Sequence, residues 1–263
     1  MWAAYDDRRP FLVVMVALIS MTWLALWLWS LSPYARFLDH ELLGEIEFTF
    51  SGEYLALLLI FVAGWTLMLV AMMLPTSLPL ITLYRRLTRR RPDRLLLLVL
   101  LICGYLGIWI LFGALAHVGD LFVHETVERS AWVEANAWVI GAGTIMLAGI
   151  YQFTPLKYKC LEKCRSPLSF ITEHWTGRGE RSQALRLGMH HGLFCVGCCW
   201  SLMLLMFVVG IGNLGWMLAL GTVMAVEKNV RWGKRISAPL GVALVGWSLG
   251  LVVSATLAAQ TIH

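Results

Sequence analysis

Three cysteines crowd one short apolar stretch of this chain. Residues 192–200 read GLFCVGCCW and contain Cys195, Cys198 and Cys199. Thiols of this kind bind soft metals as thiolates, exchange with disulfides, or pack as small apolar side chains. The neighbouring residues and their spacing are needed to distinguish these three roles.

Helical geometry extends the cysteine stretch into a longer set of candidate ligands. At about 100° per residue, one face of a helix collects an imidazole, three thiols and two thioethers over roughly 22 Å of its length. This face comprises His191, Cys195, Cys198, Cys199, Met203 and Met206. A single methionine is usually a packing residue, but five sulfurs on one face favour a soft-metal site.

A second pair of thiols lies in YQFTPLKYKCLEKCRSP, residues 151–167. A helix after Pro155 places Cys160 and Cys164 on one face, one turn apart. The neighbouring lysines and arginine favour the thiolate form. The alternatives are a solvated basic loop with two incidental cysteines, or lipidation beside a membrane. Cys103 stands alone in an apolar run and is expected to be a small buried hydrophobe.

Methionines in two other apolar runs supply possible partners. MLVAMMLP, residues 68–75, contains the candidate ligands Met72 and Met73, and Pro75 is expected to disturb the helix. Further along, Met217, Met224 and Lys228 fall on one face, and the three runs together could enclose a sulfur-rich core. Glu227 and Lys228 are either interfacial anchors or bundle-facing groups that hold a ligand, relay a proton or neutralise charge.

The composition places the chain in a membrane. Of its 263 residues, 59% are hydrophobic and 14% charged, outside the range of ordinary soluble domains. Apolar runs long enough to cross a bilayer predict an all-α bundle of about seven transmembrane helices in a single domain, residues 1–263. The spans are expected near residues 11–31, 54–84, 94–118, 133–155, 184–210, 213–231 and 236–258.

The distribution of charge predicts the orientation. Every Lys and Arg except Arg36 and Arg129 falls on one side of the predicted spans, and acids gather on the other, so the N-terminus is expected inside and the C-terminus outside. The acids are Asp39, Glu41, Glu45, Glu47, Glu53, Asp120, Glu125, Glu128 and Glu134. The net charge of +5 therefore reflects topology and contact with the lipid bilayer, and indicates no nucleic-acid partner.

The ligand types favour one metal and leave two rival functions open. Thiolates with thioethers favour Cu(I), whereas zinc, the alternative ion, rarely uses methionine. Cys195 and Cys198 also form a C-x-x-C motif, so a membrane thiol-disulfide oxidoreductase is one rival. A non-catalytic scaffold subunit is the other. The sequence lacks G-x-S-x-G, H-E-x-x-H and P-loop motifs, so no catalytic residues are assigned.

Three blocks of sequence together resemble a known family. AMMLPTSLPLI, the Cys160/Cys164 segment and GLFCVGCCWSLMLLMFVVGIGNLGWMLALGTVMAVEKN are similar to bacterial integral membrane proteins described as predicted metal-binding, a domain-of-unknown-function family linked to copper. The resemblance covers roughly residues 60–230. It implies a multi-pass protein of the bacterial inner membrane.

The resemblance also points to this chain's metal ligands and its partners. The family's motif positions correspond here to Cys160, Cys164, Cys195, Cys198, Cys199, Met72, Met73, Pro75, Met203 and Met206. Ligand chemistry and resemblance together predict copper transport, or copper delivery to a membrane cuproenzyme or from a copper-chaperone partner. The oligomeric state is left open.

Overall fold

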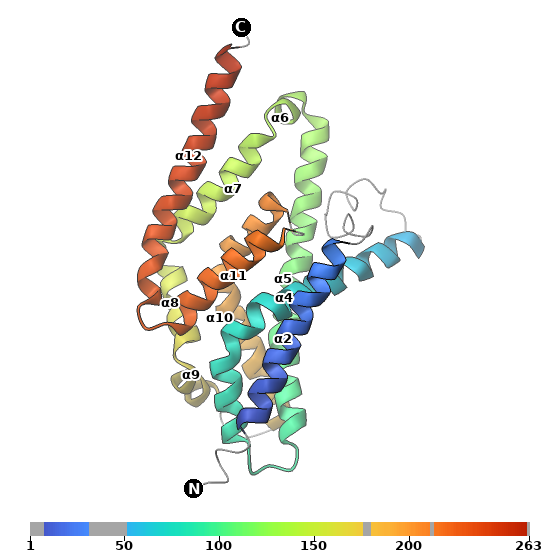
Figure 1. Ribbon diagram of the computed structural model, residues 1–263, viewed down its shortest axis with the longest axis vertical. Coiled ribbons are helices and arrows are strands. Elements are labelled where there is room, and N and C mark those ends of the chain that lie inside the picture. Colours follow the sequence, from blue (N-terminus) through green and yellow to red (C-terminus); the bar gives the residue numbers. More distant parts are fainter. Residues whose placement is uncertain (1–7, 32–51, 176–179, 211–212, 262–263) are drawn as a thin grey trace.

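The computed structural model describes residues 8–31, 52–175, 180–210 and 213–261, and every regular element in these ranges is helical (Figure 1). The predicted all-α fold is therefore confirmed for this part of the chain. The elements are α2 (Arg8–Ser30), α4 (Gly52–Leu87), α5 (Arg94–Arg129), α6 (Ala131–Ala135), α7 (Trp138–Tyr151), α8 (Pro155–Arg165), α9 (Pro167–His174), α10 (Glu180–Val209), α11 (Leu214–Asn229), the 3₁₀ helix η2 (Gly233–Ile236) and α12 (Ser237–Thr261).

Within the described ranges, five helical segments are long and apolar enough to cross a membrane. They are Pro10–Ser30, Leu59–Leu87, Arg94–Val127, Glu180–Val209 and Gly233–Leu257. A sixth span results if α7 and α8, which are bent by 65° at residues 152–154, count as one broken span. The predicted sixth span corresponds to α11, whose 16 residues fall short of a full crossing. The count of seven therefore stays a prediction.

The outward faces of the long helices are apolar. Leu95, Phe122 and Val242 are each more than 60% exposed, and they lie on α5 and α12. Large apolar side chains on the outside of a helix bundle fit a hydrocarbon solvent, because water would make their exposure unfavourable. The surface supports the membrane assignment that the composition predicted.

The helix ends separate into two groups (Figure 1). The connection between α4 and α5 lies at the same end as α9, whereas α6 and the last turn of α12 lie at the opposite end. Arg36 and four of the acids used to predict the orientation, Asp39, Glu41, Glu45 and Glu47, lie outside the described residues. Which end faces the cytoplasm stays a prediction.

Helix α10 is the centre of the bundle and packs most closely against α5. A Cβ atom added at Gly188 of α10 would overlap the carbonyl oxygen of Leu101, and one at Gly104 of α5 would overlap that of Leu185. Small residues let two backbones approach in this way where lipid supplies no hydrophobic driving force between helices. Because the two helices touch, Tyr105, which follows Gly104 on α5, lies against the face of α10 that carries Cys195.

Candidate metal centre

Eleven thiol and thioether residues of α4, α8, α10 and α11, named here the sulfur cluster, lie in one buried core that also contains apolar residues such as Trp109, Leu202 and Leu220. All eleven of its thiol and thioether residues are at most 8% exposed, and half-buried Cys164 packs against them. The eleven are Met68, Met72, Met73, Cys160, Cys195, Cys198, Cys199, Met203, Met206, Met217 and Met224. Every predicted ligand except His191 therefore belongs to, or packs on, this sulfur cluster.

The two thiols of α8 reach the sulfur cluster because the chain turns before them. The hydroxyl of Thr154 accepts a hydrogen bond from the backbone N–H of Lys157 at 3.4 Å, and Pro155 occupies the first turn, as at many helix starts. The helix predicted after Pro155 is present, and Cys160 and Cys164 lie on it one turn apart. A Cβ at Gly197 of α10 would come within 2.6 Å of the Cys160 sulfur, so this contact depends on glycine.

Cys164 of α8 and Cys198 of α10 bring two thiols close together between helices, with 4.0 Å between their sulfur atoms. Metal–thiolate bonds are about 2.3 Å long, so two sulfurs on one ion lie roughly 3.8 to 4.6 Å apart, depending on the angle at the metal. The observed distance fits two ligands of one soft ion. A disulfide needs about 2.05 Å between its sulfurs, and all six cysteines are free.

Cys195 lies one turn before Cys198 on α10, and its sulfur has polar neighbours from two other helices, α5 and α11. The ammonium of Lys228, on α11, donates to its sulfur at 2.9 Å and lies 3.7 Å from the sulfur of Cys199. The Tyr105 hydroxyl lies 3.1 Å from the Cys195 sulfur, and it also donates to the carbonyl oxygen of Met73 at 3.3 Å. A buried thiol with an ammonium donor is a strong anchor for a cation that replaces its proton.

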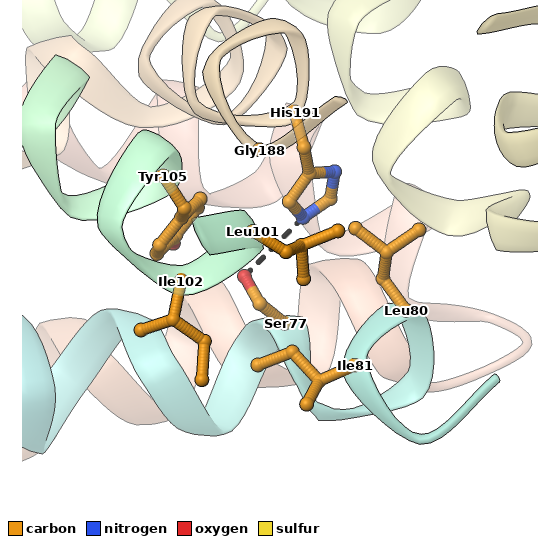
Figure 2. A pocket seen from close by; sticks show the side chains of 8 residues that line it. All are labelled: Ser77, Leu80, Ile81, Leu101, Ile102, Tyr105, Gly188 and His191. Atoms are coloured by element: carbon orange, nitrogen blue, oxygen red, sulfur yellow. Dashed lines mark hydrogen bonds between the residues drawn. The ribbon is translucent and has the colours of Figure 1, made fainter. Parts of the chain in front are cut away.

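The His191 ring faces Ser77 of α4. Its Nε2 lies 3.3 Å from the Ser77 hydroxyl (Figure 2). His191, Ser77 and Tyr105 line a cavity of about 10 Å³, which is close to the space that one water molecule needs. Its other nitrogen, Nδ1, is buried with no hydrogen-bond partner among the described residues. His191 is therefore adjacent to the sulfur cluster with one unpaired nitrogen, and its role as a ligand stays a prediction.

Glu227 and Lys228 are both buried, but they do not pair with each other. The Lys157 ammonium lies 2.8 and 3.0 Å from the two carboxylate oxygens of Glu227 and also donates to Gln152. Ser237 donates to the same carboxylate at 2.6 Å. The buried Lys157–Glu227 pair joins α8 to α11, while the Lys228 ammonium turns to the thiols.

Arg165 fastens the other end of α8. Its guanidinium donates to the carbonyl oxygens of Val230 and Arg231 at 2.8 and 2.9 Å, and also to that of Glu227. These carbonyls end α11, where orphan acceptors and the negative end of the helix dipole favour a cation. The segment bearing Cys160 and Cys164 is thus held to α11 at both of its ends.

The donor chemistry fits a soft ion, whereas the arrangement is not a closed cage. Among the described side chains, no three of the types His, Cys, Asp and Glu are placed to hold one metal ion. The close pair of Cys164 and Cys198 supplies two sulfur ligands, and any third ligand would have to move toward it.

Sequence reasoning did not identify Tyr105 or Thr76, whose hydroxyl accepts from the Lys228 ammonium at 3.3 Å, and it took Lys157 as a basic neighbour of the thiols without seeing its pairing with Glu227. The small-residue spacing G-x-x-x-G at residues 188–192 is a signal for close helix contact. It would have directed attention to the facing residues of α5. Lys157 offered no comparable signal, because it is one of several charged residues in α8 and nothing in the sequence marks it as the buried one.

The fold and the site together define a class: helical proteins of the membrane type with a buried thiol and thioether core. Residues 62–251 match the PpoB2 family, which is described as a copper chaperone. The match covers more than half of the chain, so the chain belongs to this family, and the predicted resemblance to a copper-linked family is confirmed. No curated protein and no solved structure matches the chain.

Proposed function

We propose that this protein binds Cu(I) in the sulfur cluster and delivers it to a membrane cuproenzyme. The observation that carries the proposal is the part-buried Cys164–Cys198 pair, with 4.0 Å between its sulfurs, at a core that also holds methionines from α4, α10 and α11. Thiolates and thioethers select Cu(I) over harder ions. Membership of a copper chaperone family supports copper as the cargo.

The route that we propose starts at α8. Cys164 is half-buried, whereas Cys198 and Cys195 are buried. An ion taken up by Cys164 and Cys198 has Cys195, Cys199 and the methionines as its next ligands. If the basic loops face the cytoplasm, as predicted, the ion enters from the cytoplasm at α8. The sulfur residues of α10 from Cys195 to Met206 then lead toward the opposite face of the membrane. This geometry would serve transport as well as delivery.

The test is Cu(I) binding by the full chain, purified without oxygen in lipid nanodiscs and titrated against a Cu(I)-specific chelator. The variant Cys164→Ser/Cys198→Ser is compared with Cys103→Ser. The prediction that Cys103 is buried was wrong: it is exposed on α5 and lies outside the sulfur cluster, so it serves as the control. We expect wild type and Cys103→Ser to bind alike and the double variant to lose at least about tenfold in affinity, or about 1.4 kcal/mol. Equal affinities in all three proteins would refute the site.

Transfer is tested separately. Cu(I)-loaded protein is mixed with vesicles that contain a copper-depleted membrane oxidase, and return of oxidase activity is followed. Delivery predicts recovery faster than with an equal amount of the free Cu(I)–chelator complex. If oxidase activity recovers no faster than with the chelator complex, the proposed delivery is refuted, whereas the proposed Cu(I) binding is not affected.

A further inference from the structure

Lys228 is a buried cation whose partners are sulfur atoms and a hydroxyl group. It is 6% exposed, and its ammonium lies 2.9 Å from the Cys195 sulfur, 3.7 Å from that of Cys199 and 3.3 Å from the Thr76 hydroxyl. The adjacent carboxylate, Glu227, is occupied by Lys157. Lysines are rarely buried without a charged partner, so a negative charge at the thiols would stabilise the buried ammonium.

The charges next to the Lys228 ammonium can be counted from these contacts. Lys157 and Glu227 cancel each other, and methionine is neutral whether or not it binds a metal. Metal binding removes the thiol protons. The two thiols that face Lys228 then contribute two negative charges, and the ammonium contributes one positive charge.

We propose that Lys228 sets the charge of the ion that Cys195 and Cys199 accept. A monovalent ion on two thiolates leaves one negative charge, which the ammonium neutralises. A divalent ion on the same two thiolates is already neutral, so the ammonium would leave an unpaired positive charge in a buried site. Such a charge is strongly unfavourable. Lys228 thereby favours Cu(I) over Zn(II) without coordinating either ion.

This inference rests on the proposed function, since it requires a thiolate site that takes up copper. It adds a residue that determines specificity through the thiolates and does not itself touch the metal. A lysine that only packed or anchored α11 would affect both ions equally. The ratio of two affinities therefore separates the two roles, whereas a single affinity would not.

The experiment measures Ag(I), as a redox-stable monovalent probe, and Zn(II) on the full chain in nanodiscs by competition with chelators. Lys228→Met removes the charge with little change in length, Lys228→Gln keeps a hydrogen-bond donor without the charge, and Lys228→Arg keeps the charge. Lys234→Met is the matched control, because Lys234 is exposed in η2 and contacts the Tyr158 ring.

We expect both neutral variants to shift the Ag(I)/Zn(II) affinity ratio toward Zn(II) by at least about tenfold. Lys228→Arg and Lys234→Met should keep the wild-type ratio. The proposal is overturned if Ag(I) and Zn(II) affinities change by the same factor, or if Lys228→Arg shifts the ratio as far as Lys228→Met. Two neutral variants guard against the misfolding of one. Wild type that binds neither Ag(I) nor Cu(I) would refute the proposed function itself.

Discussion

Replacing Lys157 by methionine should destabilise the protein more than replacing both members of its ion pair. The side chains of Lys157 and Glu227 are 0% and 2% exposed, and their atoms meet at 2.8 and 3.0 Å. Lys157→Met leaves the Glu227 carboxylate buried with Ser237 as its remaining side-chain donor. Removing one partner of a buried pair costs about 3 to 5 kcal/mol.

The double variant Lys157→Met/Glu227→Gln removes the stranded charge. Its cost should fall to about 1 to 2 kcal/mol, because a neutral amide is less expensive to bury and still accepts from Ser237. The assay is unfolding of the full chain in one detergent, where about 3 to 5 kcal/mol corresponds to a Tm lowered by roughly 6 to 20 °C. The double variant should recover more than half of that loss.

The matched control is Lys163→Met. Lys163 pairs with Glu173 on the surface, where the two side chains are 38% and 50% exposed. An exposed pair contributes about 0 to 1 kcal/mol, so the control should unfold within a few degrees of wild type. A single Lys157 variant that is as stable as wild type, or a double variant as unstable as the single, would refute the reasoning about the stranded carboxylate.

Three further experiments test how the site is built. Gly188→Ala should lower stability by at least about 2 kcal/mol in thermal unfolding, because its Cβ meets backbone on α5, whereas Gly107→Ala, with open space around it, should be neutral or stabilising. Met72→Leu should change stability by less than about 1.5 kcal/mol but weaken Cu(I) binding; unchanged binding would make Met72 a packing residue. Diamide, which takes two electrons and two protons from a thiol pair, should join Cys164 to Cys198 in apo protein, as read by mass spectrometry, and prior Ag(I) loading should prevent it. A Cys195–Cys198 disulfide would support the oxidoreductase alternative instead.

Local periodicity predicted the face of α10 well, since a continuous helix fixes the relative direction of its side chains. Cys195, Cys198, Cys199, Met203 and Met206 are all at most 1% exposed. Helical spacing assigns residues to a face without any knowledge of the neighbours. The Thr154-Pro155 start of α8 is local in the same sense, and the structure confirms the helix after it.

Contacts between helices could not be predicted in this way. Hydropathy ended the third span near residue 118, but α5 continues to Arg129, because loss of apolar character does not break a helix. Pro75 and Pro79 lie inside α4 and do not end it. The neighbours of Glu227 and Lys228 are distant in sequence, so the motif alone left several roles open. Three-dimensional packing assigns Glu227 to Lys157 and Lys228 to Cys195.

The order of these two residues explains how one turn of α11 serves both halves of the site. Successive residues of a helix differ in direction by about 100°. Glu227 can therefore hold α8 while Lys228 reaches α10, and each charge meets its own partner. The carboxylate fixes the helix that carries Cys160 and Cys164, and the ammonium approaches the thiols to which the ion would pass. The last turn of α11 therefore contacts both the helix that carries Cys164 and the buried thiol of Cys195. A displacement of this turn would change the position of α8 and the charge next to Cys195 together.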